Sequence, residues 1–212
     1  MRKVKFVSKK YYHIFNRGVD KRIIFVDKLD TDRFYQSMFE FNTTETIGSI
    51  YENLFRKSLL GSLASKSHKK LVNFICYCLN PNHYHFILSP LVDKGIEKFM
   101  HKIGGGYTNY FNGKYKRNGS LFQGTFKAIC IDSNEYLLHL SAYINLNNKI
   151  HSLGSLASKS SWNEYIDDKQ TGFCNKEMIL GQFKNPSEYK KFAEDSLVDI
   201  RHRKDIEKLL LE

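Results

Sequence analysis

The sequence lacks several features that define whole classes of protein. Its four cysteines (Cys76, Cys78, Cys130 and Cys174) include no Cys-x-x-Cys pair, so they form no recognisable disulfide framework. We expect small buried thiols in a reducing compartment. No hydrophobic run reaches the length of a membrane span, and the basic N-terminus is not followed by a signal-peptide core. We therefore expect a cytoplasmic protein with no membrane partner.

Acidic residues are also scarce. The chain has 33 Lys and Arg against 22 Asp and Glu, a formal net charge of +11. A basic surface attracts nucleic acid and releases its condensed counterions. Residues 98–131 hold six basic and no acidic side chains, interleaved with Phe and Tyr. Cations for phosphates beside rings for unpaired bases are typical of a single-strand binding surface, although a solvated basic face would have the same composition.

The length of 212 residues and the 42% hydrophobic content suit one full domain with an appendage. Alternating and β-branched runs predict strands over 10–16, 72–79, 83–88 and 126–131. Apolar spacing of three to four predicts helices from about residue 30, over 93–112, over 132–148 and over 196–212. We expect Asp30 or Thr31 to cap the first of these helices.

One octapeptide, LGSLASKS, occurs twice, at 60–67 and at 153–160. Two copies do not make a solenoid, which needs several stacked repeats. We interpret both copies as loop insertions, and a duplicated binding element is the alternative.

The segment Leu-Asn-Pro-Asn-His-Tyr-His-Phe at 79–86 places two imidazoles one residue apart, just after a turn. In a strand, His83 and His85 project from the same face, where their nitrogens can converge on one cation. Tyr84 should face the other side. The pair is equally compatible with two histidines that cap a turn or hydrogen-bond internally.

The helix expected over 132–148 carries Tyr136, His139, Tyr143 and Asn147 on one broad face. If that face looks at the histidine pair, the Asn147 amide oxygen becomes a third ligand, and the set suits Mg²⁺ or Mn²⁺. Tyr143 could then attack a phosphorus atom. Spacing alone does not separate a nucleophile from a core tyrosine among the 13 present.

Several stretches resemble the IS200-like single-tyrosine transposases of the HUH endonuclease superfamily, above all their REP-associated branch. The resemblance covers about residues 11–149 in the family's order. The matching stretches are YHIFNRG (12–18), LNPNHYHF (79–86), YFN (110–112), GSLFQGTFK (119–127), EYL (135–137) and YINLN (143–147).

The resemblance implies an α+β, ferredoxin-like domain with a central antiparallel sheet at 1–150, followed by a helical extension at 151–212. It implies that Tyr143 is the catalytic nucleophile and that His83, His85 and Asn147 hold Mg²⁺ or Mn²⁺. The substrate would be single-stranded DNA near a palindromic hairpin, nicked and rejoined through a 5′-phosphotyrosine.

Six residues are expected to contact this DNA: Arg17, Lys114, Lys116, Arg117, Gln123 and Lys127. The guanidinium of Arg17 suits bidentate recognition of phosphate or guanine. The alternatives are a non-catalytic hairpin-binding regulator that retains the fold, and a replication initiator or relaxase, whose helicase module has no room here. The sequence leaves open a monomer or a homodimer.

Overall fold

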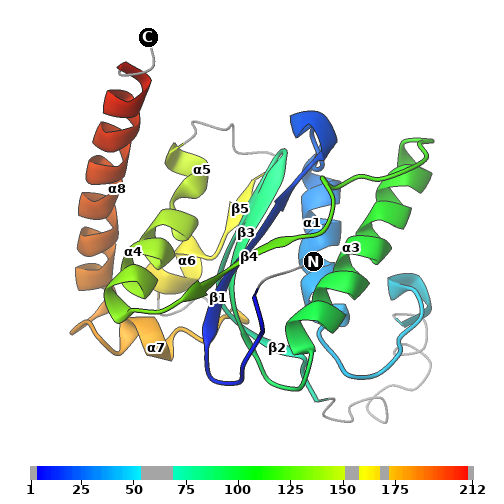
Figure 1. The fold of residues 1–212 in the computed structure, drawn as a ribbon, viewed down its shortest axis with the longest axis horizontal. Coiled ribbons are helices and arrows are strands. Elements are labelled where there is room, and N and C mark those ends of the chain that lie inside the picture. The colour runs from blue at the N-terminus through cyan, green and yellow to red at the C-terminus, as the bar shows by residue number, and fades with distance from the viewer. Residues whose placement is uncertain (1–3, 54–68, 151–157, 168–171, 210–212) are drawn as a thin grey trace.

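The computed structural model describes residues 4–53, 69–150, 158–167 and 172–209, and shows one sheet between two layers of helices (Figure 1). The strands are β1 (Tyr11–Arg17), β2 (Val72–Asn80), β3 (His83–Pro90), β4 (Lys127–Ile131) and β5 (Lys159–Ser160). The helices are α1 (Lys28–Glu40), α3 (Gly95–Lys114), α4 (Asn134–Asn145), α5 (Asn147–Ile150), α6 (Trp162–Ile166), α7 (Glu177–Leu180) and α8 (Pro186–Leu209), and a short 3₁₀ turn, η1, spans Val19–Lys21.

The sheet has the order β4-β1-β3-β2-β5, and every neighbouring pair is antiparallel. The first four strands follow the chain order β1-α1-β2-β3-α3-β4, which is the ferredoxin-like arrangement. The predicted α+β fold class is therefore confirmed. Residues beyond 150 contribute the short edge strand β5 and the helices α6 to α8.

Alternation along the strands divides the core into two halves. Tyr12, Ile14 and Phe86 pack on one face of the sheet under α1 and α3. Ile75 and Ile87 pack on the other face, which is covered by α4 and the C-terminal helices (Figure 1). Helices at the C-terminus are thus confirmed, and α8 lies against α4.

The start of α1 corrects one expectation. Asp27, not Asp30 or Thr31, is the N-cap, because its carboxylate accepts a hydrogen bond of 2.9 Å from the amide of Asp30. Asp30 and Thr31 lie inside the first turn and are buried. The helix therefore begins one turn earlier than the apolar stripe alone suggests.

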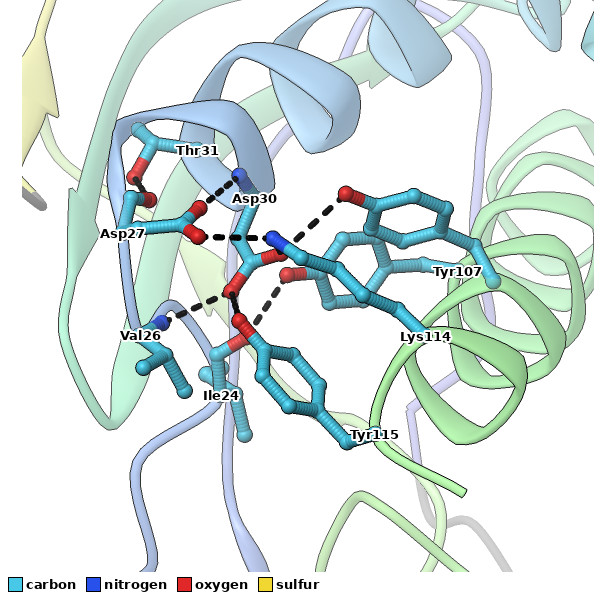
Figure 2. Close-up of polar contacts among 9 residues, drawn as sticks. Ile24, Val26, Asp27, Asp30, Thr31, Tyr107, Lys114 and Tyr115 are labelled. Carbon is cyan, nitrogen blue, oxygen red and sulfur yellow. Dashed lines mark hydrogen bonds and ion pairs between the residues drawn. The ribbon is translucent and has the colours of Figure 1, made fainter. Parts of the chain in front are cut away.

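Asp30 instead joins the start of α1 to the end of α3 (Figure 2). Its buried carboxylate accepts hydrogen bonds from the amide of Val26 at 2.9 Å and the hydroxyl of Tyr115 at 2.7 Å. The ammonium of Lys114 lies 2.7 Å from Asp30 and 2.7 Å from Asp27. These bonds compensate the desolvation of the Asp30 charge.

Five of the seven Phe and Tyr side chains of residues 98–131 are also placed differently from our expectation. Phe99, Tyr107 and Phe111 are buried in the core under α3, and Tyr110 and Tyr115 donate hydrogen bonds to Asp30. These rings are therefore not stacking platforms for bases. Composition could not show this, because core aromatics and base-stacking aromatics are the same residue types.

The cysteines agree with expectation, since all four are thiols outside any disulfide and three are buried. Among the described residues, no helix is both long and apolar enough to cross a bilayer. Most of the two octapeptide copies lies outside the described residues, so their interpretation as loop insertions stays a prediction.

Candidate functional site

His83 and His85 are the first and third residues of β3, next to the turn, as the hairpin pattern predicts. Strand β3 begins at His83, directly after the turn at Pro81 and Asn82. His83 and His85 point to the side of α4, whereas Tyr84 is buried among aromatic rings on the side of α1 and α3. The expected opposite orientation of Tyr84 is confirmed.

Strand β1 lies alongside and brings further side chains to the same face. The register pairs Arg17 with His83 and Phe15 with His85. A cleft of about 700 Å³ opens at this end of the sheet. Its lining residues are Phe15, Asn16, Arg17, Lys21, Asn82, His83, His85, Gln123 and Lys127. The lining includes three cations and no carboxylate, so this cleft favours an anion.

His83 is held at both ring nitrogens. Its Nδ1 atom lies 2.6 Å from the side-chain oxygen of Asn82, and its Nε2 atom lies 2.9 Å from the side-chain nitrogen of Asn80. Both bonds are satisfied when Nδ1 carries the proton and Nε2 accepts. The Nε2 lone pair then also faces Oδ1 of Asn147, 3.3 Å away.

Asn147 is fully buried beside His83. Its Oδ1 atom accepts a hydrogen bond of 2.5 Å from Asn80, and its Nδ2 atom is buried without a hydrogen-bond partner among the described residues. The amide of Asn80 thus sits between two acceptors, the imidazole of His83 and the oxygen of Asn147. This buried amide group is the position on which both lone pairs converge.

His85 is oriented by a third histidine, His13 of β1. The Nε2 atom of His13 lies 2.9 Å from the Nδ1 atom of His85, and the two rings stack with Phe15. Burial lowers the pKa of His13 to about 4, so its ring is neutral near pH 7 and able to accept a hydrogen bond from His85. With Nδ1 of His85 used in this way, Nε2 is its nitrogen for a ligand.

Tyr143 lies next to this group but outside the lining of the cleft. Its ring contacts His85 edge-on, with centroids 5.9 Å apart, and is half-buried. Burial raises the pKa of the phenol, and the nearby side-chain amide of Asn147 partly offsets this rise. The phenol is therefore protonated at neutral pH.

The helix that carries Tyr143 differs from expectation. Helix α4 ends at Asn145, and Asn147 starts the separate turn α5 after a break at Leu146. His139 does not share the face of Tyr143, because its Nδ1 atom lies 3.2 Å from the hydroxyl of Ser196 on α8. Tyr143 and Asn147 meet the histidines, whereas His139 belongs to the contact between helices.

The residues present fit a divalent cation. Two ligands at right angles on an ion with bonds of about 2.1 Å are about 3.0 Å apart, close to the 3.3 Å between His83 and Asn147. One amide oxygen and imidazole nitrogens suit Mg²⁺ or Mn²⁺. Among the described residues no group of three His, Cys, Asp or Glu is arranged to hold an ion, so the fit depends on the asparagine.

The six predicted DNA contacts separate into two groups. Arg17, Gln123 and Lys127 line the cleft, and Arg17 hydrogen-bonds to Gln123 through its Nε atom. Lys114 pairs with Asp27 and Asp30 (Figure 2), while Lys116 and Arg117 do not line the cleft.

Sequence reasoning missed six residues of this site: His13, Phe15, Asn16, Lys21, Asn80 and Asn82. His13 and Phe15 alternate with Ile14 in β1, which places them on the face of Arg17. The alternation can be read from the sequence, but the strand register that sets Phe15 opposite His85 and His13 beside it cannot.

Comparison with known proteins identifies the family of the chain. The family model for IS200-like transposases ("Transposase IS200 like") matches residues 6–147, about two thirds of the chain. The chain therefore belongs to the IS200-like transposase family. In this member of the family, a histidine pair on an antiparallel sheet lies next to a tyrosine on a following helix. No curated protein matches the sequence.

Two solved structures are similar to this chain. A REP-associated tyrosine transposase bound to a REP hairpin is 12% identical with a TM-score of 0.48, covering 82% of this chain and 88% of that one. A candidate transposase from Deinococcus radiodurans R1 is 14% identical with a TM-score of 0.37, covering 68% of this chain and 95% of that one.

Proposed function

We propose that the protein is a metal-dependent endonuclease and strand transferase for single-stranded DNA next to hairpins, with Tyr143 as nucleophile. The observation that carries the proposal is the meeting of three groups from distant elements. The phenol of α4 lies against His85 of β3, and Asn147 of α5 lies 3.3 Å from His83. Membership in the IS200-like transposase family supports the same reaction class.

His83, His85 and Asn147 would hold Mg²⁺ or Mn²⁺. When bound, the cation polarises the scissile phosphate and stabilises the charge that develops on its oxygens. The side chains of Arg17, Lys21 and Lys127 hold the phosphates of the strand in the cleft.

Tyr143 supplies the attacking oxygen. As its bond to phosphorus forms, the bond from phosphorus to the 3′ oxygen breaks, and the proton of the phenol ends on the released 3′ hydroxyl. The 5′ end stays on the protein as a phosphotyrosine ester. Attack by another 3′ hydroxyl reverses the step and restores the phenol, so the strand is rejoined without ATP.

The test compares Tyr143→Phe with Tyr136→Phe, a matched change of an exposed tyrosine two turns earlier in the same helix. Purified protein is incubated with a library of single-stranded hairpin oligonucleotides and Mn²⁺, and adducts are resolved on denaturing gels. We expect wild type and Tyr136→Phe to form an adduct, and Tyr143→Phe to bind DNA without one. An adduct that survives Tyr143→Phe, or a wild-type protein that binds hairpins but never forms one, contradicts the proposal.

A further inference from the structure

A second cleft, of about 550 Å³, lies between α3 and residues 120–126. It adjoins the first cleft, because Asn16 lines both. The segment 122–127 also serves both clefts: Gln123 and Lys127 face the first, whereas Phe122 and Phe126 face the second. A strand held in the first cleft therefore reaches the second by passing over this segment.

The wall that α3 contributes to the second cleft includes two glycines, Gly104 and Gly105. Its residues, from Glu97 to Asn109, recur every three to four positions along a stripe of about 18 Å. A Cβ atom on Gly104 or Gly105 would meet no other atom within 4 Å. On Gly106 it would lie 2.6 Å from the ring of Phe41, so packing requires that glycine. Glycine inside a helix is destabilising relative to alanine, and no packing within the described residues explains Gly104 and Gly105.

The two clefts differ in chemistry. The first is lined by three cations and suits phosphate, whereas no Lys or Arg lines the second. Tyr84, Phe122 and Phe126 give the second cleft an aromatic floor. Glu97 also lines it, and the Oε2 atom of Glu97 is buried without a hydrogen-bond partner among the described residues. A carboxylate repels phosphate, but it accepts hydrogen bonds from the N–H groups of a neutral base.

We propose that the second cleft binds an unpaired guanine of the same DNA strand, with Glu97 as the acceptor. The inference rests on the proposed function, since the strand must occupy the first cleft. Guanine is favoured because its pairing edge presents N1–H and N2–H side by side, a match for one carboxylate. Thymine presents carbonyl oxygens on both sides of its single N–H, which a carboxylate repels. The bare glycine face provides the room for the base to approach α3.

The test measures binding in EDTA, so that it is independent of cleavage. Fluorescent dT 11-mers carry dG, deoxyinosine or dT at the central position, and their affinities for the full chain are measured by anisotropy. We expect dG to bind about tenfold more tightly than dT, with deoxyinosine, which lacks the 2-amino group, in between.

Glu97→Gln should reduce the preference for dG to less than about twofold and leave the affinity for the dT oligonucleotide unchanged. Glu194→Gln, an exposed carboxylate on α8, is the control for lost charge and should keep the preference. Gly105→Leu, which places a side chain in the open cleft, should abolish the preference as well. Melting temperatures show whether each variant is folded.

The results distinguish a failure of the guanine site from a failure of the proposed function. If wild type binds the dT oligonucleotide through Lys127 but shows no preference for dG, the guanine site is wrong and the proposed function stands. If no oligonucleotide binds, or if binding is insensitive to Lys127→Ala, the DNA cleft itself is wrong. A preference for dG that persists in both Glu97→Gln and Gly105→Leu also overturns the assignment of this cleft.

Discussion

The imidazole of His13 lies against that of His85, with Nε2 of the first 2.9 Å from Nδ1 of the second. The stack spans two neighbouring strands, since His13 belongs to β1 and His85 to β3. A histidine that donates its second N–H to a fixed acceptor is held in one tautomer and one orientation. His13 is thus placed to keep Nε2 of His85 available for a cation.

His13→Phe should therefore weaken Mn²⁺ binding by about 10- to 100-fold, the usual effect of losing such a supporting acceptor. The phenyl ring keeps the stacking with Phe15 but cannot accept a hydrogen bond from His85. Isothermal titration with Mn²⁺, without DNA, measures the change. His13→Gln, whose side-chain oxygen can accept, should retain most of the affinity. Equal affinities in wild type and His13→Phe would show that His13 only packs.

Asn80→Ala should shift stability and metal affinity in opposite directions. The Asn80 amide donates to Asn147 at 2.5 Å and faces Nε2 of His83 at 2.9 Å, which is where a shared cation would sit. Removing it takes a hydrogen-bond donor from the buried oxygen of Asn147 and from the half-buried ring of His83, which should lower the free energy of unfolding in EDTA by about 1–3 kcal/mol. With saturating Mn²⁺ the loss should shrink, because the cation satisfies both acceptors. By linkage, Mn²⁺ affinity rises.

Urea unfolding with and without Mn²⁺ measures both effects. Asn42→Ala is the matched control, since the Asn42 side chain hydrogen-bonds to the backbone of Leu71 and Val72, far from the histidines. Its cost should be the same in both conditions. A fall in Mn²⁺ affinity for Asn80→Ala would instead indicate that the oxygen of Asn80 is itself a ligand.

Much of the histidine side of the site could be predicted from the sequence. Pro81 between two asparagines marks the turn, and strict alternation separates His83 and His85 from Tyr84. These are local rules, and a hairpin depends on local sequence. The pairing of β1 with β3 joins residues about 70 positions apart, so Phe15 could not be set opposite His85, nor His13 beside it, without the structure.

The helix side of the site was harder to predict for a different reason. Helical periodicity shows which residues share a face, but not what that face meets. His139 and Tyr143 were expected together, yet α4 contacts both α8 and the sheet, and the two residues divide between them. The break at Leu146 has no sequence signal such as glycine or proline. The N-cap of α1 is a similar case. It is Asp27 and not the expected Asp30, because the sequence does not show that Asp30 is buried.

The cysteines should differ sharply in reactivity. Cys130 is exposed on the edge strand β4, whereas Cys76, Cys78 and Cys174 are buried. Burial raises the pKa of the Cys78 thiol to about 12 and raises those of Cys76 and Cys174 well above their usual value, so these three thiols are protonated near neutral pH. We expect a thiol reagent to modify one group per native chain and four in guanidinium. Cys130→Ser should remove the native reaction, and rapid labelling of a second thiol would contradict the buried placement.

Substitution of Lys127 should change DNA binding and not stability, whereas substitution of Lys114 should change stability and not DNA binding. Lys127 lines the cationic cleft, whereas Lys114 compensates the buried carboxylate of Asp30 (Figure 2). Lys127→Met should weaken binding of all single-stranded DNA and reduce the slope of log K against log salt by about 0.7, the loss of one phosphate contact. Its melting temperature should not change, because an exposed lysine stabilises the fold little.

Lys114→Met should leave Asp30 charged and buried without its cation, which costs about 3–5 kcal/mol of unfolding free energy. The affinity of the folded fraction for DNA, and its salt slope, should match wild type. Anisotropy titrations at several salt concentrations and urea unfolding of both variants measure the two effects. A reduced salt slope for Lys114→Met would return Lys114 to the DNA surface, because an ammonium held by two carboxylates releases no counterion from phosphate.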